Sequence, residues 1–139
     1  MEASDCENIA LIEHSSFSTP WTLSSFENEL KNSNATYFVA ELSGKIVGYI
    51  GVHNVLDEGE ITTFAVDKEF RGMGYGKSLI EHLLMYEKSN NISKIFLEVR
   101  ENNISARKLY EKTGFLVYGQ RNDYYTNPTE NAVLMIKTF

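Results

Sequence analysis

Residues 71–78 read RGMGYGKS and connect a segment with strand character to a segment with helical character. The stretch ends in Gly-Lys-Ser, but a P-loop needs a first glycine where Arg71 stands. The dinucleotide fingerprint G-x-G-x-x-G also fails, because its third glycine would fall on Lys77 or Leu79. The pattern that remains is R-x-x-G-x-G between a strand and a helix.

This pattern suits the binding of an anion. The first turn of a helix has unpaired N–H groups and carries a partial positive charge. Glycines let the backbone approach a bulky anion without a clash at Cβ, and Arg71 and Lys77 add positive charge beside it. We therefore expect a phosphate group at this loop. The alternative is an ordinary glycine-rich connection whose Arg and Lys are solvated.

Ten predicted elements surround the loop. Their order is ααβββαβαββ, which is typical of an α+β or mixed α/β fold built around one sheet. The helices are expected at 5–16, 20–30, 76–89 and 105–113, and the strands at 36–42, 46–55, 60–67, 94–100, 115–121 and 132–139.

Local signals predict where some of these elements begin and end. Ser24 and Glu27 have the spacing of a capping box for the second helix. Asn103 can cap the fourth helix, and Gly114 would stop it. Residues 57–59 indicate a loop before the third strand.

Size and composition restrict the kind of protein. The chain has 139 residues, of which 42% are hydrophobic and 23% are charged, and this predicts one compact domain over 1–139. A formal net charge of -6 argues against charge-driven binding to nucleic acid or to an anionic membrane. The single cysteine, Cys6, cannot form an internal disulfide, and the first residues lack the features of a signal peptide. We expect a cytoplasmic protein.

The loop and its surroundings resemble the GCN5-related N-acetyltransferases (GNAT), and the element order matches that fold from residue 1 to 139. Within this family, four stretches are similar to the bacterial ribosomal-protein-alanine N-acetyltransferases. They are FSTPW (17–21), LDEGEITTFAV (56–66), IFLEVRENNISARKLYEKTGF (95–115) and RNDYYTNPTENAVLMIK (121–137).

The resemblance implies a fold, a reaction and a set of partners. The fold would be a central, mostly antiparallel sheet flanked by helices. The reaction would transfer an acetyl group from acetyl-CoA to a peptide N-terminus, namely the N-terminal alanine of the eighteenth protein of the small ribosomal subunit. The acetyl group would pass directly between the two bound substrates. No metal, nucleic acid or membrane is implied.

The resemblance also implies which residues bind acetyl-CoA. The third strand should separate from its neighbour between Thr63 and Val66, so that the pantetheine pairs with its open edge. One N–H group of this stretch would face the thioester carbonyl. Asn103 should hydrogen-bond the cofactor, unless it serves only as a helix cap. The full predicted set is Phe64, Ala65, Val66, Arg71, Gly72, Met73, Gly74, Tyr75, Gly76, Lys77 and Asn103.

A carboxylate is expected to deprotonate the attacking amine. A peptide α-amine has a pKa of ~8 and a lysine side chain one of ~10.4, so the α-amine loses its proton more readily at neutral pH and needs a weaker base. Glu98 alternates with Leu97 and Val99, and it faces either a cleft or solvent. The resemblance implies that Glu98 is the general base. Glu60, which begins the third strand, is the competing candidate.

A phenol is expected to protonate the leaving thiolate. The pKa of a phenol, ~10, exceeds that of a thiol, ~8.5, so a tyrosine stays protonated at neutral pH. Tyr110 lies in KLYEKTGF, a context that resembles the catalytic tyrosine of the family. The resemblance implies that Tyr110 is the general acid. Packing under the last strands is the alternative role for this residue.

Loops are expected to choose the acceptor. Residues 17–21 and 124–125 would form walls beside it, and Asp57, Glu58 and Glu60 would attract an ammonium or a basic peptide. Core packing of the aromatic residues and solvation of the acids are the alternatives. Other N-termini, lysine, a small amine, and a non-catalytic acetyl-CoA-binding module remain open. A route through an acetyl-cysteine is not expected, because Cys6 lies far in sequence from the proposed site.

Overall fold

The computed structural model describes residues 1–139 and confirms the predicted order of elements, with three-residue 3-10 helices at Ala3–Asp5 and Lys68–Phe70 in addition. No helix in it combines the length and the apolar character needed to cross a membrane. The helices are α1 (Cys6–Ser16), α2 (Leu23–Glu29), α3 (Tyr75–Ser89) and α4 (Ile104–Lys112). The strands are β1 (Ala35–Leu42), β2 (Lys45–Val55), β3 (Glu58–Val66), β4 (Lys94–Arg100), β5 (Leu116–Tyr125) and β6 (Glu130–Thr138).

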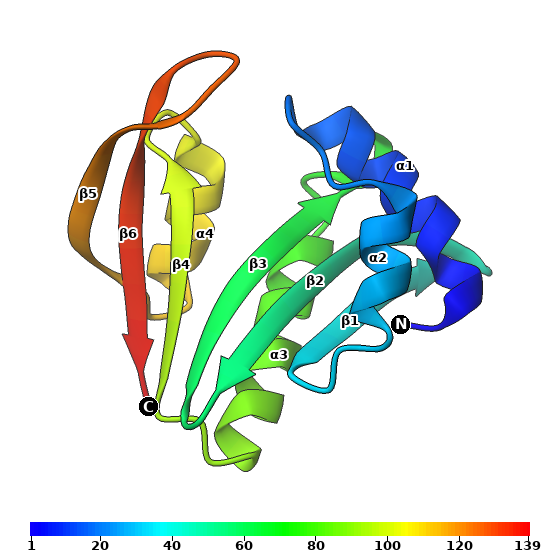
Figure 1. Cartoon of the computed structure of the whole chain (residues 1–139), viewed down its shortest axis with the longest axis horizontal. Coiled ribbons are helices and arrows are strands. Elements are labelled where there is room, and N and C mark those ends of the chain that lie inside the picture. The colour runs from blue at the N-terminus through cyan, green and yellow to red at the C-terminus, as the bar shows by residue number, and fades with distance from the viewer.

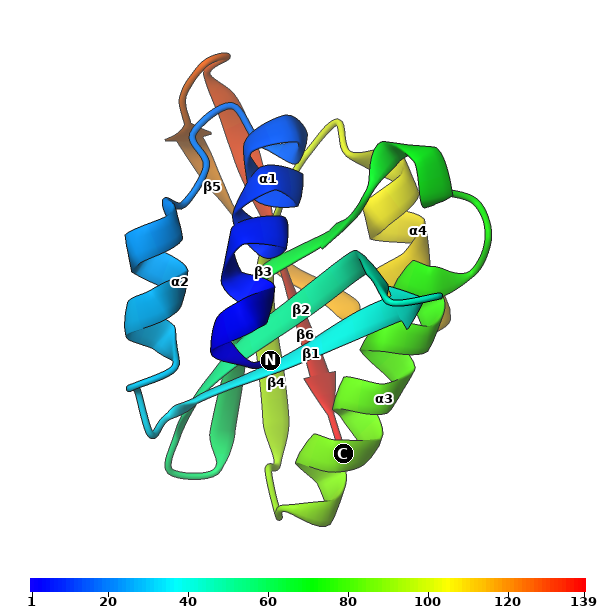
Figure 2. The same cartoon turned by 90° about the vertical axis from the view of Figure 1, so that its right-hand side faces the viewer.

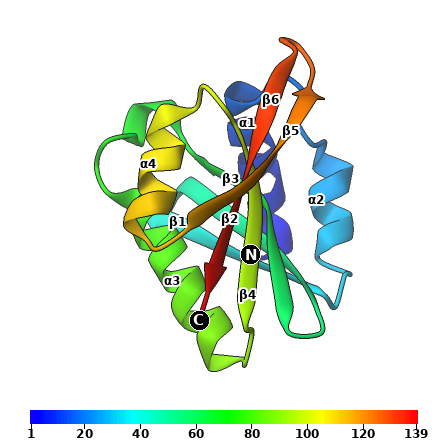
Figure 3. The same cartoon turned by 90° about the vertical axis from the view of Figure 1, so that its left-hand side faces the viewer.

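The six strands form one sheet in the order β1-β2-β3-β4-β6-β5 (Figure 1). Every neighbouring pair is antiparallel except β3 and β4, which are parallel. Helices α1 and α2 cover one face, and α3 and α4 cover the other (Figures 2 and 3). The sheet is therefore mostly antiparallel and flanked by helices, as predicted.

Each face of the sheet has its own hydrophobic core. The alternation of each strand sends apolar side chains to both faces, and each helix contributes one apolar stripe. Under α3 and α4 the larger cluster includes Ile50, Leu83 and Leu97. Under α1 and α2 the smaller cluster includes Phe26 and Tyr49. The two cores lie on opposite faces of the sheet and share no residue.

Two of the local predictions were wrong. The N-cap of α2 is Thr22, whose backbone is extended and whose hydroxyl accepts a hydrogen bond from the Ser25 N–H at 3.2 Å, so Ser24 and Glu27 lie inside the helix and form no capping box. Strand β3 begins at Glu58, because Glu58 and Gly59 pair with both β2 and β4 instead of forming a loop.

Strands β3 and β4 stay together for only a short distance. Three residue pairs join them, the last being Glu60 with Phe96, and beyond that point the strands separate (Figure 1). The separation thus begins before Thr63, slightly earlier than predicted. It leaves one edge of β3 without a strand partner, as the resemblance implied.

A bulge in β3 lies at the start of this separation. Gly51 of β2 pairs with Thr63, whereas Val52 pairs with Ile61, so Thr62 is an extra residue. The extra residue changes which side chains face which core. Ile61 lies in the core under α3, and after the bulge Phe64 packs against that same core while Thr63 contacts α1.

Candidate active site

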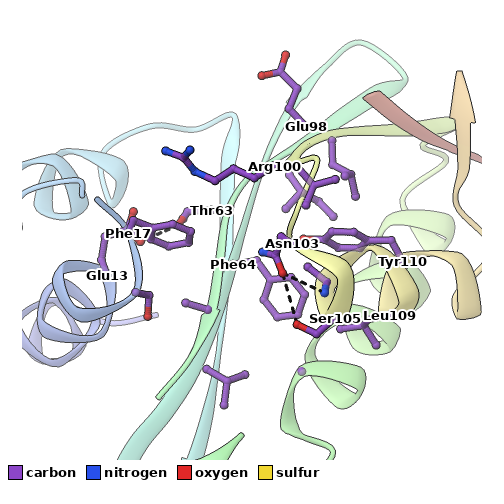
Figure 4. Close-up of a pocket in the computed structure, with 18 of the residues that line it drawn as sticks. Glu13, Phe17, Thr63, Phe64, Glu98, Arg100, Asn103, Ser105, Leu109 and Tyr110 are labelled. Carbon is purple, nitrogen blue, oxygen red and sulfur yellow. Dashed lines mark hydrogen bonds between the residues drawn. The ribbon is translucent and has the colours of Figure 1, made fainter. Parts of the chain in front are cut away.

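A cavity of about 870 Å³ lies where β3 and β4 separate (Figure 4). Its walls come from the α1–α2 connection, the open part of β3, the start of α3, the end of β4, the start of α4 and the β5–β6 connection. Glu98, Tyr110 and all but one of the residues predicted to bind acetyl-CoA line it. The exception is Met73, which is 65% exposed and lies outside the lining.

The loop before α3 has a row of unused donors. The six backbone N–H groups from Gly72 to Lys77 have no hydrogen-bond acceptor within the protein, because the first bond of α3 runs from Ser78 to Gly74. Gly72 and Gly74 have φ angles of 78° and 90°, which favour glycine, and a Cβ on either would meet open space. The loop therefore presents a cradle of N–H groups in which a diphosphate fits.

Arg71 has partners of its own within the protein. Its Nε donates to the Val66 carbonyl at 2.9 Å, and its Nη2 donates to the Ser16 hydroxyl at 3.3 Å. These bonds join the loop to the end of β3 and to the end of α1. Arg71 thus anchors the cradle, in addition to adding positive charge beside it.

The open edge of β3 leads from the cradle into the gap. Phe64, Ala65 and Val66 pair with β2 on one side only, and their other edge faces the cavity. An extended chain such as pantetheine can add to an edge of this kind through backbone hydrogen bonds. The side chain of Phe64 also packs against the ring of Tyr110, with 6.2 Å between the ring centroids.

Tyr110 projects from α4 into the gap, and its hydroxyl points toward β3 (Figure 4). The residue is 7% exposed, lies against Phe115, and forms no side-chain hydrogen bond to the protein. Burial raises the pKa of the Tyr110 phenol well above its ordinary value. The hydroxyl is therefore protonated at neutral pH and free to donate a hydrogen bond.

Glu98 approaches the gap from the other face of β4. Leu97 and Val99 are buried under α4, so Glu98 between them faces the side of α1, and its carboxylate points away from Tyr110 (Figure 4). It lies 3.6 Å from Arg121, and it raises the pKa of the neighbouring Tyr124 phenol. Glu98 lines the cavity, whereas Glu60, the competing candidate, is exposed outside the lining.

The Asn103 side chain has one free end. Its Oδ1 accepts from the Ala106 N–H at 3.2 Å and caps α4, which confirms the predicted cap. Its Nδ2 donates to no protein group and remains available to a ligand in the cavity. The cap fixes the orientation in which that donor is presented.

Residues 6–115 match the profile of the acetyltransferase (GNAT) family. The match covers most of the chain, including both separating strands and the loop between them. The chain belongs to the GNAT family. It is an acetyl-CoA-dependent acyltransferase, and the cradle, the open strand edge, Glu98 and Tyr110 all line the one cavity described above.

The chain is similar in sequence or structure to several known acetyltransferases. A Bacillus subtilis protein, named as a candidate [ribosomal protein bS18]-alanine N-acetyltransferase, is 38% identical over 97% of this chain and 90% of its own length. The crystal structure of the ribosomal-protein-S18-alanine N-acetyltransferase from Escherichia coli superposes with a TM-score of 0.92 and 29% identity, over 99% of this chain and 90% of that one. A Bacillus anthracis protein in complex with acetyl-CoA, named as a candidate streptothricin acetyltransferase, superposes with a TM-score of 0.72 and 32% identity, over 82% of this chain and 68% of that one.

The acids near the GNAT active site differ from those predicted. Asp57 and Glu58 lie at the turn where β2 meets β3, at the end of the sheet where β3 and β4 are still paired, and Asp57 accepts a hydrogen bond from Ser93 there. They are remote from the cavity because β3 runs away from that turn. The acids that line the cavity are Glu13, Glu98 and Glu130.

Glu13 is a site residue that the sequence reasoning missed. It is 3% exposed, accepts hydrogen bonds from the hydroxyls of Tyr49 and Thr63, and lines the cavity beside β3. Burial raises the pKa of the Glu13 carboxyl. The available signal was its spacing, because Glu13 follows Ile9 by four residues and therefore lies on the apolar face of α1.

The predicted walls of the acceptor site lie mostly at the cavity, whereas the single thiol does not. Phe17, Trp21 and Tyr125 line the cavity, but Tyr124 does not. Cys6 is buried in α1 and lies outside the lining. No group of three or more His, Cys, Asp or Glu side chains is arranged to hold a metal ion.

Proposed function

We propose that this GNAT enzyme acetylates protein N-termini and that its acceptor is the N-terminal alanine of ribosomal protein bS18. The relatives from Bacillus subtilis and Escherichia coli, which carry that activity in their names, support this acceptor because they match nearly the whole chain. Residues 1–139 would act as one catalytic domain, and a ribosomal acceptor would place the reaction in the cytoplasm.

One observation supports the proposed chemistry most strongly. A row of six unpaired N–H groups lies at the same cavity as the open edge of β3, and Glu98 and Tyr110 line that cavity from β4 and α4. The diphosphate of acetyl-CoA would bind the row, and the pantetheine would follow the edge. Asn103 would donate its Nδ2 to the same ligand, and Lys77 would add positive charge beside the diphosphate.

The residues then have separate roles in one transfer. Glu98 takes a proton from the ammonium, directly or through water, so that the neutral amine can attack the thioester carbonyl carbon. An N–H group of Phe64, Ala65 or Val66 stabilises the charge that develops on the carbonyl oxygen. As the C–N bond forms and the C–S bond breaks, Tyr110 gives its proton to the sulfur. The nitrogen loses its second proton to water, and water returns a proton to the Tyr110 phenolate.

Direct transfer suits the position of the only thiol. Cys6 is buried in the first turn of α1, about two turns before Glu13, and does not line the cavity, so it is not placed to take the acetyl group. The amine and the thioester would instead meet in the gap, approaching from opposite faces of β4. The acids Glu13 and Glu98 would make the acceptor side attractive to an ammonium group.

A peptide assay tests the acceptor. The purified protein receives acetyl-CoA and either a hexapeptide with the N-terminal sequence of bS18 or a copy with a blocked N-terminus and an internal lysine. We expect mass spectrometry to find acetylation of the first peptide at its α-amine and none of the second. Equal acetylation of both would contradict the proposed acceptor, and binding of acetyl-CoA without turnover of either would indicate a non-catalytic module.

A further inference from the structure

The Arg100 side chain has an unusual number of partners for a residue at a strand end. It is 24% exposed, and its guanidinium donates to the Thr126 carbonyl at 2.8 Å and to the Pro128 carbonyl at 3.0 Å. It also pairs with Glu130 at 3.2 Å and stacks on the Tyr125 ring, with 4.5 Å from Cζ to the ring centroid. All of these partners belong to β5, β6 and the connection between them.

A further bond crosses the mouth of the cavity. Nη2 of Arg100 donates to the Ser18 hydroxyl at 3.2 Å, and Ser18 lies in the α1–α2 connection. Figure 4 shows the side chain extending from β4 toward the segment that carries Phe17. No hydrogen bond runs directly from the α1–α2 connection to the β5–β6 connection, and Arg100 is the residue that donates to both. Arg100 is therefore the link between the two predicted walls of the acceptor site.

We propose that Arg100 is a positioning residue that joins the two walls of the acceptor groove and so determines which amines reach Glu98. This inference rests on the proposed function, because it assigns the groove to the acceptor. Arg100 lies two residues after Glu98, and the alternation of β4 places both on the same face. The link therefore lies directly beside the proposed base.

The chemistry of the guanidinium suits this role. Its planar fork presents five donors at fixed angles, so it can bind two carbonyls, a hydroxyl and a carboxylate while its face rests on Tyr125. A lysine ammonium has three donors and no flat face, and it could not hold both walls at once. Walls that are held before the acceptor arrives lose less conformational entropy when it binds.

The charge of Arg100 does not oppose an incoming ammonium. Glu130 pairs with the guanidinium, and its second oxygen accepts the Asn102 N–H at 2.6 Å. This N–H and Arg100 together hold the pKa of the Glu130 carboxyl below its usual range, so the carboxylate stays ionised. The pair is close to neutral as a unit, and Glu98 and Glu13 remain as the acids that face the acceptor.

Three variants test the link by kinetics. Arg100→Ala and Arg100→Lys remove all or most of the contacts, and Ser18→Ala removes only the bond across the cavity mouth. We expect KM for the bS18 peptide to rise about tenfold or more in the two Arg100 variants, which lose several charge-assisted hydrogen bonds, and about threefold in Ser18→Ala, which loses only the bond to the Ser18 hydroxyl. The KM for acetyl-CoA should stay unchanged, and acetylation of the blocked lysine peptide should increase relative to the α-amine. Ser15→Ala is the matched control, because its hydroxyl bonds only within α1.

Hydrogen exchange tests the link without any turnover. In Arg100→Ala and Ser18→Ala, amides at 17–22 should exchange faster than in the wild type, and in Arg100→Ala so should those at 124–130. Amides at 72–77 should not change. Unchanged exchange in both walls, or equal losses for both substrates, would overturn the inference. If the wild type acetylates neither peptide, the proposed acceptor fails, and the exchange result still decides the role of Arg100.

Discussion

At the scale of single residues, burial determines the protonation state of the Tyr110 phenol. Tyr110 lies in an apolar surrounding formed by Phe64 and Phe115, with no hydrogen-bond acceptor for its hydroxyl. The same burial that stabilises the fold therefore keeps the phenol protonated and unpaired. A ligand that places a sulfur in the gap would supply the missing partner.

Loss of the Tyr110 hydroxyl should affect the chemical step and leave binding intact. We expect Tyr110→Phe to lower kcat by roughly 10²-fold to 10³-fold, the usual contribution of a general acid, with KM for acetyl-CoA unchanged. Because burial raises the pKa of Tyr110, the wild-type rate should show no loss from this group up to about pH 10, the ordinary phenol value. Tyr118→Phe, on the exposed part of β5, is the control. An unchanged kcat in Tyr110→Phe would exclude the acid role.

The defect of a Glu98 variant should depend on pH. A free α-amine with a pKa near ~8 deprotonates by itself in alkaline solution, so it needs a base mainly at lower pH. We expect Glu98→Gln to lose most of kcat/KM at pH 6.5 and to recover much of it at pH 9. The measurement is the pH profile of both proteins with the bS18 peptide. A deficit of constant size across this range would argue that Glu98 only positions the acceptor.

Glu87 is a buried acid far from the cavity, and it affects stability. One oxygen accepts from Asn54 Nδ2 at 3.1 Å, while the other oxygen and Asn54 Oδ1 have no partner. Burial raises the pKa of Glu87 in the folded protein. A raised folded-state pKa means that the stabilising contribution is present below the ordinary carboxyl range and is lost as pH rises through the folded value.

A glutamine at position 87 should remove this pH dependence. The amide carries no charge to bury, and its NH₂ group can donate to Asn54 Oδ1. We expect Glu87→Gln to gain about 1 kcal/mol of unfolding free energy at pH 8, roughly one hydrogen bond, and to differ little at pH 4.5. Urea unfolding at both pH values measures this, and a variant that is less stable at pH 8 would refute it.

At the scale of elements, the bulge in β3 connects packing to the active site. Thr62 is the extra residue, and it lies where β3 leaves β4. Because of it, Phe64 faces Tyr110 while Thr63 reaches Glu13 on the opposite face. A single inserted residue thus lets one strand face both the proposed cofactor side and the proposed acceptor side of the gap.

Gly51 supports this bulge from β2, where it pairs with Thr63. A methyl group at Gly51 would overlap the ring of Tyr37. We expect Gly51→Ala to lose about 1–3 kcal/mol of unfolding free energy, the usual cost of overpacking a core. Urea unfolding provides the measurement. Gly119→Ala is the matched control, since its Cβ would meet only Leu134 at 3.4 Å, and equal stability of the two variants would contradict the explanation.

At the scale of the whole molecule, the sequence predicted the elements and those parts of the proposed site that depend on residues close together in the chain. The R-x-x-G-x-G pattern, the Asn103 cap and the face of Glu98 all depend on residues close together in the chain. The acids at Asp57 and Glu58 were misplaced because the direction of β3 within the sheet was not known. Glu13 and Arg100 were missed because their partners are remote: Thr63 is 50 residues from Glu13, and Ser18 is 82 residues from Arg100.

Within the whole fold, β3 and β4 separate after three residue pairs, although neighbouring strands in a sheet normally stay paired. The two halves of the sheet share one hydrophobic core under α3 and α4, yet β3 and β4 are no longer paired beyond Glu60 and Phe96. Helices α3 and α4 cover one face of the sheet and α1 and α2 the other (Figures 2 and 3), and the cavity at the separated strands is lined from both sides. In the proposed function, donor and acceptor would enter from opposite sides and meet at the edge of β3.

A crystal structure of the protein soaked with acetyl-CoA tests this account most directly. We predict that the diphosphate accepts hydrogen bonds from the N–H groups of residues 72–77 and that the pantetheine lies along Phe64 to Val66. The thioester sulfur should lie within hydrogen-bond reach, roughly 3 Å, of the Tyr110 hydroxyl. A diphosphate bound elsewhere, or a thioester outside the gap between β3 and β4, would contradict the account.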